Sequence, residues 1–334
     1  MAPKVSILLP VFNAAETLAD SLRSIRRQSC LDWECVLVDD GSTDGSVEVA
    51  RAVALKDSRV NVLPRDHSGL IETLNAGVEN CRGEFVARLD ADDWMRRDRL
   101  ESQIGGLEDD PTLDLVGTHV RIFPRDGLGD GSRDYERWLN SMRLPEDISR
   151  ERFVECPLAH PTWTMRRATL NRLGYRDRGW PEDYDFLLRL LQSGGKAGIV
   201  PRRLVGWRHH TRRLSRHDPR YSLQQFTACR AYFLASGFLK DTDGFLLWGY
   251  GQTGRALRRE LAKHGKQLSG LIEVHPGRIG QEIHGAAVVA PEDIGTLPNH
   301  PLIVSVAGAG PRNEIRDKLA QLNRVEGRDF VCAA

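Results

Sequence analysis

The stretch that decides the fold is residues 84–94, which read Glu-Phe-Val-Ala-Arg-Leu-Asp-Ala-Asp-Asp-Trp. Its first half is a short apolar run, which predicts a buried strand. The run ends in three carboxylates within four residues, Asp90, Asp92 and Asp93. Clustered carboxylates repel one another, so they favour a bound cation, and oxygen ligands suit Mg²⁺ or Mn²⁺. The structural alternative is an acidic turn in which Asp92 or Asp93 caps the next helix.

Strands alternate with helices on the N-terminal side of this stretch. Three further apolar runs predict buried strands at residues 5–13, 33–38 and 60–63. The alternation predicts right-handed crossovers and a mainly parallel sheet. Asp39 and Asp40 follow one of these strands, as Asp90 and Asp92 follow another. Because ligands bind at the carboxyl ends of such strands, both acidic pairs are expected to line one crevice.

Length and composition limit the class of protein. With 334 residues, the chain has room for two domains with hydrophobic cores. The 47 Lys and Arg residues balance 46 Asp and Glu residues, so the whole surface favours neither nucleic acid nor membrane. Six scattered cysteines without a C-x-x-C pair indicate reduced thiols. With no signal-peptide pattern and no long apolar run, these features predict a cytoplasmic protein.

Three motifs carry a resemblance to a known family. They are residues 6–13 (Ser-Ile-Leu-Leu-Pro-Val-Phe-Asn), 38–44 (Val-Asp-Asp-Gly-Ser-Thr-Asp) and 89–93 (Leu-Asp-Ala-Asp-Asp). In this order they resemble family-2 glycosyltransferases, over roughly residues 3–220. The resemblance implies the GT-A nucleotide-sugar-binding fold, an α/β domain with a mainly parallel mixed sheet. It also implies sugar transfer from a nucleoside diphosphate donor to a hydroxyl of a glycan or lipid-linked glycan, in cell-surface polysaccharide or glycolipid synthesis.

The resemblance also assigns donor-binding residues and metal ligands. The residues that would bind the donor are Asp40 at the nucleobase, Pro10, Val11 and Phe12 in the floor of the base pocket, and Asp90 at the ribose. Asp92 would hold the metal, Mn²⁺ or Mg²⁺. Two positions depart from the family pattern: His67 stands where Asn is usual, and Leu74 stands where many members carry Arg.

A helix predicted from about residue 182 carries acids in its first turn. Glu182 and Asp183 match the family's Glu-Asp motif, in which inverting members use a carboxylate to take the acceptor proton. The resemblance therefore implies that Asp183 is the general base and that Glu182 orients or binds the acceptor. Nearby aromatic side chains would raise the pKa of Asp183 toward working pH. The structural alternative is that these acids only complement the helix dipole.

Two further segments are expected to complete the site. His160 matches a family His and, with Trp180, is a candidate acceptor contact, although His160 could equally be structural. Residues 202–220 contain seven Arg and three His but only one acid. Within them, Arg208 is expected at the departing diphosphate and His210 at the diphosphate or the metal. Alternatively, this basic segment is a solvated loop, or it contacts the inner face of an anionic membrane peripherally.

The C-terminal part has a pattern of its own. The expected divisions are a GT-A domain at 1–220, a helical linker at 221–240 and a small Rossmann-like α/β domain at 241–334. A predicted strand runs into G-x-G-x-x-G, formed by Gly249, Gly251 and Gly254. Glu273 ends the next predicted strand, 19 residues after Gly254. This spacing fits a dinucleotide fingerprint, with the pyrophosphate at the helix N-terminus and Glu273 on a ribose, so NAD(P) or another nucleotide is a candidate ligand.

Three classes of protein fit parts of the sequence. The leading prediction is an inverting, metal-dependent glycosyltransferase that does not act on nucleic acid. A nucleotidyltransferase is disfavoured because no Gly-rich loop bearing Lys or Arg follows the first strand. A nucleotide- or NAD-sensing binding protein with a degenerate transferase domain is the alternative. The complete set of Asp40, Asp90, Asp92 and Asp183 disfavours that alternative.

Overall fold

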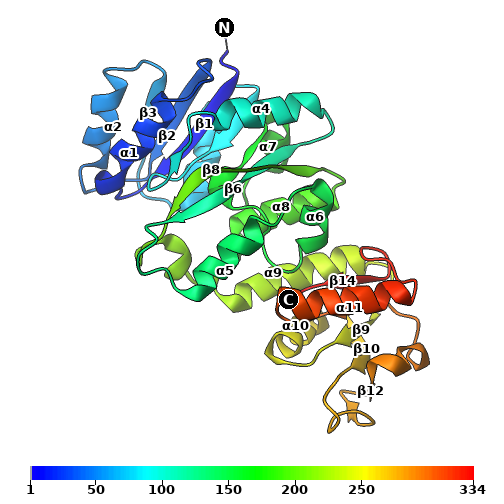
Figure 1. The fold of residues 1–334 in the computed structure, drawn as a ribbon. Helices are drawn as coiled ribbons and strands as arrows, with labels where there is room; N and C mark the ends of the chain where they lie inside the picture. Colours follow the sequence, from blue (N-terminus) through cyan, green and yellow to red (C-terminus); the bar gives the residue numbers. More distant parts are fainter. Residues whose placement is uncertain (1) are drawn as a thin grey trace. The chain divides into compact units, whose positions relative to one another are not determined.

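The structure is a computed structural model that describes residues 2–334 (Figure 1). The chain divides into two compact units. The first consists of the residues up to Ile148 together with Pro157–Asp177 and Arg189–Arg216, and the second of Ser149–Cys156, Arg178–Leu188 and His217–Ala334. This division differs from the contiguous one expected from the sequence, because two short segments of residues 1–220 pack within the second unit.

The first unit is built on a mixed sheet of eight strands (Figure 1). The strands are β1 (Val5–Val11), β2 (Trp33–Asp39), β3 (Val60–Pro64), β4 (Phe85–Arg88), β5 (Trp94–Met95), β6 (Leu115–Phe123), β7 (Thr164–Arg166) and β8 (Ala197–Arg208). Their order across the sheet is β3-β2-β1-β4-β7-β6-β8-β5. Within the group β3-β2-β1-β4 all neighbouring strands are parallel, and β6 is parallel to β8. Strand β7 is antiparallel to both β4 and β6, and β5 is antiparallel to β8.

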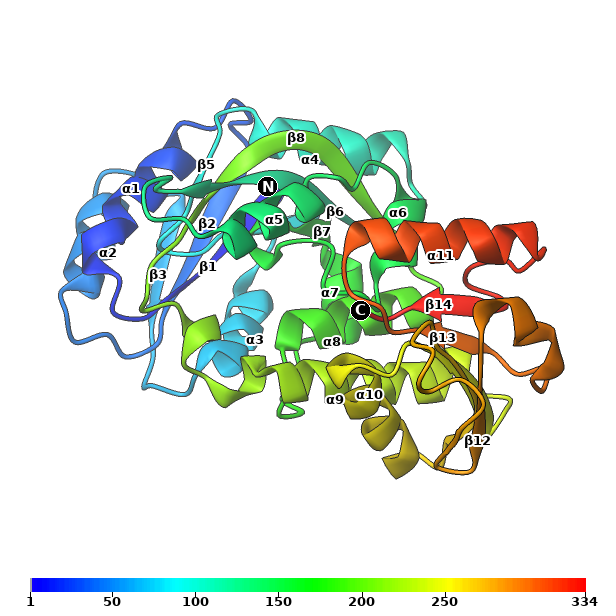
Figure 2. The ribbon, with the colours of Figure 1, turned by 60° about the horizontal axis from the view of Figure 1, so that its bottom comes forward.

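Helices cover both faces of this sheet. They are α1 (Ala15–Arg26), α2 (Ser46–Ala54), α3 (Leu70–Asn80), α4 (Arg99–Asp109), α5 (Asp130–Leu139), α6 (Pro145–Glu151), which extends into the second unit, and α7 (Arg167–Leu173). Helices α1 and α2 contact each other, and α3 packs on β1 and β2 from the other face (Figure 2). Right-handed crossovers explain this, because the chain moves outward from β1 to β3 and then returns across the sheet to β4.

The core of the first unit follows from the apolar pattern of its elements. All seven residues of β1 and all seven of β2 are buried, as expected for parallel strands covered on both faces. Helix α1 adds Leu18, Leu22 and Ile25, which share one helical face and are fully buried. Each such side chain contributes about 1.5–3 kcal/mol by burial. This packing fixes the strand ends from which the site is built.

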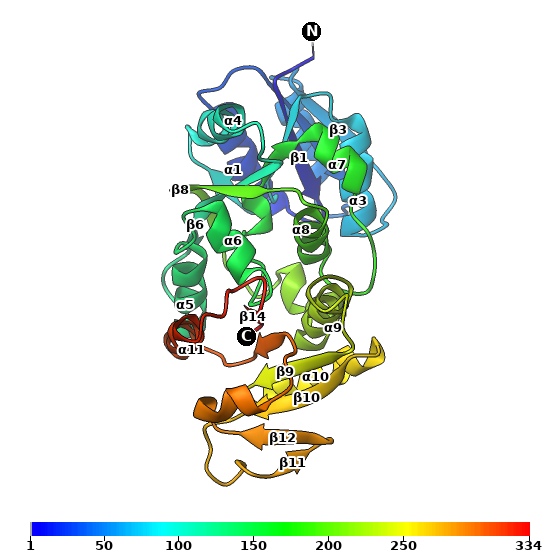
Figure 3. The ribbon, with the colours of Figure 1, turned by 90° about the vertical axis from the view of Figure 1, so that its right-hand side faces the viewer.

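The second unit contains a separate sheet of six strands (Figure 3). The strands are β9 (Gly244–Trp248), β10 (Gln267–Ile272), β11 (Glu282–Ile283), β12 (Ala286–Val289), β13 (Leu302–Val304) and β14 (Phe330–Cys332). Their order is β11-β12-β10-β9-β13-β14, and all neighbours are parallel except β11 and β12. The chain builds outward from β9 to β12 and then crosses to β13, so the direction of winding reverses between β9 and β13.

The helices of the second unit come from separate parts of the chain. They are α8 (Glu182–Gln192), of which residues up to Leu188 belong here, α9 (Leu223–Phe233), α10 (Gln252–Lys263) and α11 (Ala309–Gln321). A π-helical turn at Leu234–Phe238 continues α9. No helix in the described chain has the length and apolar composition that a bilayer crossing requires.

A buried network of ion pairs and hydrogen bonds joins segment 149–156 to the rest of the second unit. Glu151 is buried and lies 2.8 Å from the guanidinium of Arg316 and 3.5 Å from that of Arg312 on α11. Arg230 on α9 donates to the carbonyl oxygens of Val154, at 2.8 Å, and of Ala333, at 2.7 Å. Charges and carbonyls that are buried in this way must be paired, so segment 149–156 is integral to the second unit.

Candidate active site

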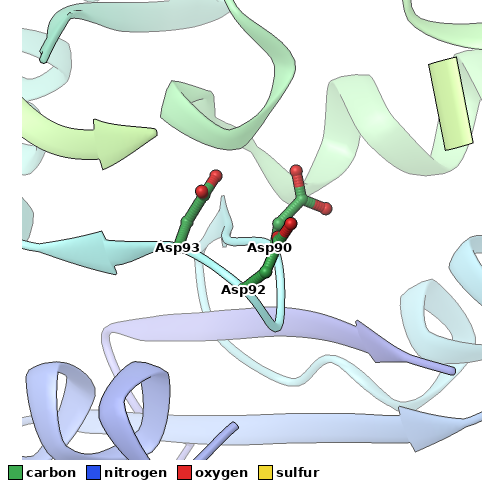
Figure 4. A group of neighbouring side chains, drawn as sticks. All are labelled: Asp90, Asp92 and Asp93. Carbon is green, nitrogen blue, oxygen red and sulfur yellow. The ribbon is translucent and has the colours of Figure 1, made fainter. Parts of the chain in front are cut away.

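Three aspartates gather in the loop between β4 and β5 (Figure 4). Asp90 and Asp92 are half-buried, whereas Asp93 is 1 % exposed. Each offers one carboxylate oxygen, and these oxygens all lie within 4.8 Å of one another. The loop leads into a strand, and the N-cap position of α4 is Asp98, so the alternative of Asp92 or Asp93 as a helix cap is wrong. The cluster can hold a metal ion.

The three carboxylates repel one another when they are ionised. Burial and the neighbouring Asp90 raise the pKa of Asp92, although His210 acts in the opposite direction. Burial, followed by the carboxylates of Asp92 and Asp90, raises the pKa of Asp93 well above its ordinary value. A divalent cation would reverse this balance, because it would favour the ionised form of all three groups.

Asp93 supplies a direct test of whether the site fits a cation. Its Oδ1 accepts a hydrogen bond of 2.6 Å from the backbone N–H of Arg208. Its Oδ2 is buried and has no hydrogen-bond partner within residues 2–334. A buried acceptor without a partner costs about 1–3 kcal/mol, which an ion would recover. Hard oxygen ligands suit Mg²⁺ or Mn²⁺, so the residues fit the expected metal.

Strand β8 brings the basic residues to this loop. Its pairing with β5 places Gly206 opposite Trp94, so the residues that follow reach the aspartates. His210 Nε2 lies 2.8 Å from Asp92 Oδ2, where a metal or diphosphate contact was predicted. Arg208 Nε donates to the backbone oxygen of Asp92 at 2.7 Å. Arg208 therefore fixes the loop, a role that the sequence did not indicate.

Arg88, unlike Arg208, is an arginine that sequence reasoning missed, and it contacts the same loop. Arg88, the last residue of β4, is 3 % exposed, and its Nη1 lies 2.6 Å from Asp90 Oδ1. The pair orients Asp90, the residue expected at the ribose. The only available signal was the position of Arg88 two residues before the first aspartate on an otherwise apolar strand.

Asp40 is used to build a turn at the start of α3. Its Oδ1 accepts from the backbone N–H of Ser68 at 2.8 Å, and its Oδ2 accepts from that of Gly69 at 3.0 Å. The Nδ1 of His67 lies 2.9 Å from the same Oδ2. The structure thus joins Asp40 to the 67–69 turn, whose His67 departs from the family pattern.

Phe12 and His67 form an exposed aromatic pair beside this turn. Their rings stack with centroids 4.4 Å apart and planes inclined by 22°, and Phe12 is 48 % exposed. Pro10 and Val11 are buried in β1, and the carbonyl oxygen of Val11 accepts from the N–H of Asp40 at 2.8 Å. Of the three residues expected in the floor of the base pocket, Phe12 therefore offers the accessible surface.

Asp39 is a residue that sequence reasoning passed over as a donor contact. It is 2 % exposed, and its Oδ2 accepts from the backbone N–H of Ser42 at 3.0 Å. Its Oδ1 is buried without a hydrogen-bond partner in the described chain. A polar atom in this state marks a place for a ligand or water, so Asp39 joins the candidate donor site.

His160 belongs to the interior of the first unit. It is 6 % exposed, its Nε2 lies 2.9 Å from the hydroxyl of Tyr175, and its ring packs against Trp163 with centroids 4.7 Å apart. These contacts are those of a structural histidine. The acceptor role stays a prediction that the geometry does not support.

The predicted base and its neighbours lie in the second unit. Helix α8 begins at Glu182, so Glu182 and Asp183 occupy its first turn. Glu182 is 2 % exposed, and its Oε2 accepts from the hydroxyl of Tyr221 at 2.6 Å. Burial, and then Glu182, raise the pKa of Tyr221 well above its ordinary value, so this hydroxyl stays protonated and donates. Asp183 is half-buried, and Trp180 Nε1 donates to Asp185 at 3.1 Å.

The part of the basic segment that belongs to the first unit makes several contacts within that unit. Arg212 bonds to Glu16 at 2.7 Å, Arg216 lies 2.8 Å from His209 Nε2, and Arg213 stacks over Trp207 at 4.2 Å. These contacts engage much of the positive charge of residues 202–216. Peripheral membrane contact through this segment stays a prediction.

A family model identifies the class of protein that this fold and site belong to. The model described as "Glycosyl transferase family 2" matches residues 6–174, which is half of the chain and includes both acidic motifs and β7. The chain belongs to glycosyl transferase family 2.

Curated relatives agree with this family. The chain is 31 % identical over 238 residues to EpsE of Bacillus subtilis (strain 168), a protein named as a glycosyltransferase, with 68 % of this chain and 82 % of EpsE covered. It is 29 % identical over 198 residues to chondroitin synthase of Pasteurella multocida (strain Pm70), covering 58 % of this chain but 19 % of that protein.

Solved structures share the fold. TarS of S. aureus (residues 1–349, with UDP) matches with a TM-score of 0.55 at 16 % identity, covering 78 % of this chain and 71 % of that chain. The mannosyltransferase PcManGT from Pyrobaculum calidifontis, with GDP-Man and Mn²⁺, matches with a TM-score of 0.51 at 20 % identity, covering 79 % and 70 %. The α/β fold of the GT-A type predicted from the sequence is confirmed.

Proposed function

We propose that this glycosyltransferase moves a sugar from a nucleoside diphosphate donor to a hydroxyl acceptor with inversion, with help from a divalent cation. The observation that carries the proposal is the cluster of Asp90, Asp92 and Asp93 at the end of β4. The names of relatives such as chondroitin synthase favour an acceptor that belongs to a growing polysaccharide.

Asp92 and Asp93 would hold the cation, together with Asp90 or His210. A divalent cation bound there would supply positive charge that stabilises the departing nucleoside diphosphate. Mn²⁺ is favoured over other ions because PcManGT was solved with it. Arg208 and Arg88 would act as positioning residues, since each holds part of the loop that carries the aspartates.

The donor nucleotide would lie along the carboxyl ends of β1, β2 and β4. The exposed ring of Phe12 and the neighbouring His67 offer a stacking surface for the base. Asp39, with its unpartnered Oδ1, and Asp40 would contact the base, and Asp90 would contact the ribose. The TarS and PcManGT complexes, with uridine and guanosine nucleotides respectively, do not decide between these bases.

Asp183 would remove the proton from the acceptor hydroxyl as that oxygen attacks the anomeric carbon. One carbon–oxygen bond then forms as the bond to the diphosphate breaks, which inverts the configuration without a covalent enzyme intermediate. Glu182, held by Tyr221, would orient the first turn of α8. Trp180 would line the acceptor side. The match of Asp183 to the Glu-Asp motif of family-2 glycosyltransferases supports its assignment as the general base.

The test is binding of UDP-, GDP- and dTDP-sugars by calorimetry, with Mn²⁺ or with a chelator. We expect one donor to bind with Mn²⁺ and to lose at least tenfold in affinity in Asp92→Ala. Asp109→Ala, an exposed carboxylate at the end of α4, is the matched control and should bind normally. If the wild type, Asp92→Ala and Asp109→Ala all bound the donor equally, with or without Mn²⁺, the metal site would be refuted.

Asp183→Asn tests the base separately. It should retain donor affinity while transfer to the acceptor falls by about 10²-fold or more, because proton removal contributes on that scale. Turnover near that of the wild type would rule out this assignment. The alternative of a sensor with a degenerate transferase domain is not favoured, since the family match covers an acidic cluster that is complete.

A further inference from the structure

The second unit contains a cavity of about 710 Å³ at the carboxyl ends of its central strands. It is lined by Trp248–Thr253 after β9, by Glu273 after β10 and by Ser305–Ala307 after β13. The winding direction of the sheet reverses between β9 and β13, and open α/β sheets bind ligands at such a place. The volume lies within the roughly 300–1,000 Å³ of small-molecule sites.

The three glycines of the loop after β9 differ in why the position is occupied by glycine. Gly249 has φ +91°, and a Cβ there would lie 2.7 Å from Val306 Cγ2. A Cβ on Gly254 would lie 2.4 Å from the carbonyl oxygen of Gly249, so this glycine allows α10 to pack against the loop. Backbone geometry and packing therefore require both residues to be glycine.

Gly251 is different, because nothing in the fold requires it. Its φ of −74° suits any residue, and a Cβ would meet no atom within 4 Å. Its place is the N-cap of α10, a helix of twelve residues that no side chain caps. A glycine here leaves the space in front of the helix N-terminus open, which lets a phosphate approach the backbone N–H groups.

Glu273 gives an independent indication of a ligand. It is 8 % exposed and lines the cavity. Its Oε1 accepts from the N–H of Tyr250 at 2.8 Å and from Arg278 Nη1 at 3.1 Å, which fixes the side chain. Within residues 2–334 the structure records no hydrogen bond to Oε2. A fixed carboxylate with one oxygen available is suited to accept hydrogen bonds from a sugar diol.

We propose that this cavity binds the ribose 5′-diphosphate part of a nucleotide. The diphosphate lies in front of α10 beside Gly251, and the 2′- and 3′-hydroxyls of the ribose donate to Glu273. The site uses residues of the second unit alone, so it stands or falls independently of the transfer reaction. It gives this family member a second nucleotide site, beyond any donor site of the first unit.

A ribose 5′-diphosphate occurs both in dinucleotides and in single nucleotides. The choice of three nucleotide probes distinguishes these two ligand classes. Calorimetry on the full-length chain carrying Asp92→Ala, in chelator, measures binding of NAD⁺, ADP-ribose and UDP. We expect at least one to bind with an affinity unaffected by Asp92→Ala. Preference for NAD⁺ or ADP-ribose identifies an adenosine site, and preference for UDP identifies a uridine site. A failure of all three at millimolar concentration overturns the proposal.

Two variants test the assigned atoms. Gly251→Asp fills the open space with a carboxylate that the fold tolerates, so binding should fall at least 100-fold. Gly129→Asp is the matched control, because Gly129 is also an N-cap glycine with negative φ and no atom within 4 Å of its Cβ. Equal binding by Gly251→Asp and Gly129→Asp overturns the phosphate assignment.

Glu273→Gln tests the ribose and keeps the proposal falsifiable if the other variant misfolds. The substitution keeps an acceptor for Tyr250 but removes the charge, so affinity should fall about tenfold. The 2′-deoxy form of the bound nucleotide should bind more weakly than the ribose form in the wild type and nearly equally in Glu273→Gln. Indifference of the wild type to the 2′-hydroxyl contradicts the contact.

Discussion

At the scale of single residues, Asp93 is a proposed metal ligand whose buried charge we expect to oppose folding. Its carboxylate is buried beside two others, and one oxygen has no partner in the described chain. Asp93→Asn keeps the acceptor for Arg208 and removes the repulsion. We therefore expect the metal-free protein to gain roughly 1–3 kcal/mol in stability, while affinity for Mn²⁺ falls at least tenfold.

Thermal unfolding in chelator and Mn²⁺ titration measure the two effects of Asp93→Asn. Asp109→Asn is the control for loss of a surface charge and should change neither quantity. A variant that lost stability and kept Mn²⁺ affinity would show that Asp93 is a structural residue.

A buried carboxylate far from the acidic loop sets part of the acid stability. Glu34 accepts from Ser6 Oγ at 2.6 Å and from Arg82 Nε at 2.8 Å. Burial alone would raise the pKa of Glu34, but the hydrogen bonds from Arg82 and Ser6 outweigh it and lower the pKa. Because the folded-state pKa is depressed, the stabilisation is present above the unfolded pKa and is lost as pH falls through the folded value.

Glu34→Gln should therefore cost about 1–3 kcal/mol at neutral pH and make stability less dependent on pH below about 4.5. Denaturant unfolding at several pH values between 3 and 7 measures this slope. Glu79→Gln, an exposed glutamate on α3, should leave the slope unchanged. An equally steep acid limb in Glu34→Gln would contradict the assignment.

At the scale of elements, the site depends on the pairing of β5 with β8. Gly206 lies opposite Trp94, and a Cβ at position 206 would come within 2.1 Å of the indole. Gly206→Ala must therefore displace β5 and the acidic loop that precedes it. We expect a loss of about 1–3 kcal/mol in stability and at least tenfold in Mn²⁺ affinity.

Gly105→Ala is the matched control for Gly206→Ala. Gly105 lies inside α4 with no atom within 4 Å of its Cβ, so alanine should stabilise the helix by about 0.5–1 kcal/mol. The free energy of unfolding and the Mn²⁺ affinity of both variants test whether the acidic loop depends on the pairing of β5 with β8. Normal metal affinity in Gly206→Ala would mean that the loop does not depend on this pairing.

The sequence predicted elements better than it predicted contacts. The apolar runs that became β1, β2 and β4 and the acidic loop after β4 were predictable, because period and turn chemistry are local. The roles of Arg88 and Arg208 were not, since they depend on which strands become neighbours. The short strand β5 and its partner β8 are more than a hundred residues apart in sequence, and no local pattern indicates such a pairing.

At the scale of the whole molecule, the two units should respond to different ligands. Each has its own sheet and hydrophobic core, so calorimetric unfolding should show two transitions. Mn²⁺ should raise the transition of the first unit, and a nucleotide bound at Glu273 should raise that of the second. At a hundredfold excess over Kd, each gain should be about 2.7 kcal/mol. A single transition that both ligands shift equally would contradict this independence.

The interleaving of the chain also bears on how the second unit can be separated. Segments Ser149–Cys156 and Arg178–Leu188 belong to this unit although they precede most of it in sequence. A protease that cut the peptide chain near residue 240 would therefore yield two fragments that remain associated, with Glu151 still bound to Arg312 and Arg316. The C-terminal fragment alone would lack part of its own interior. A gene fusion with a single junction near residue 240 would therefore not transfer the complete second unit to another protein.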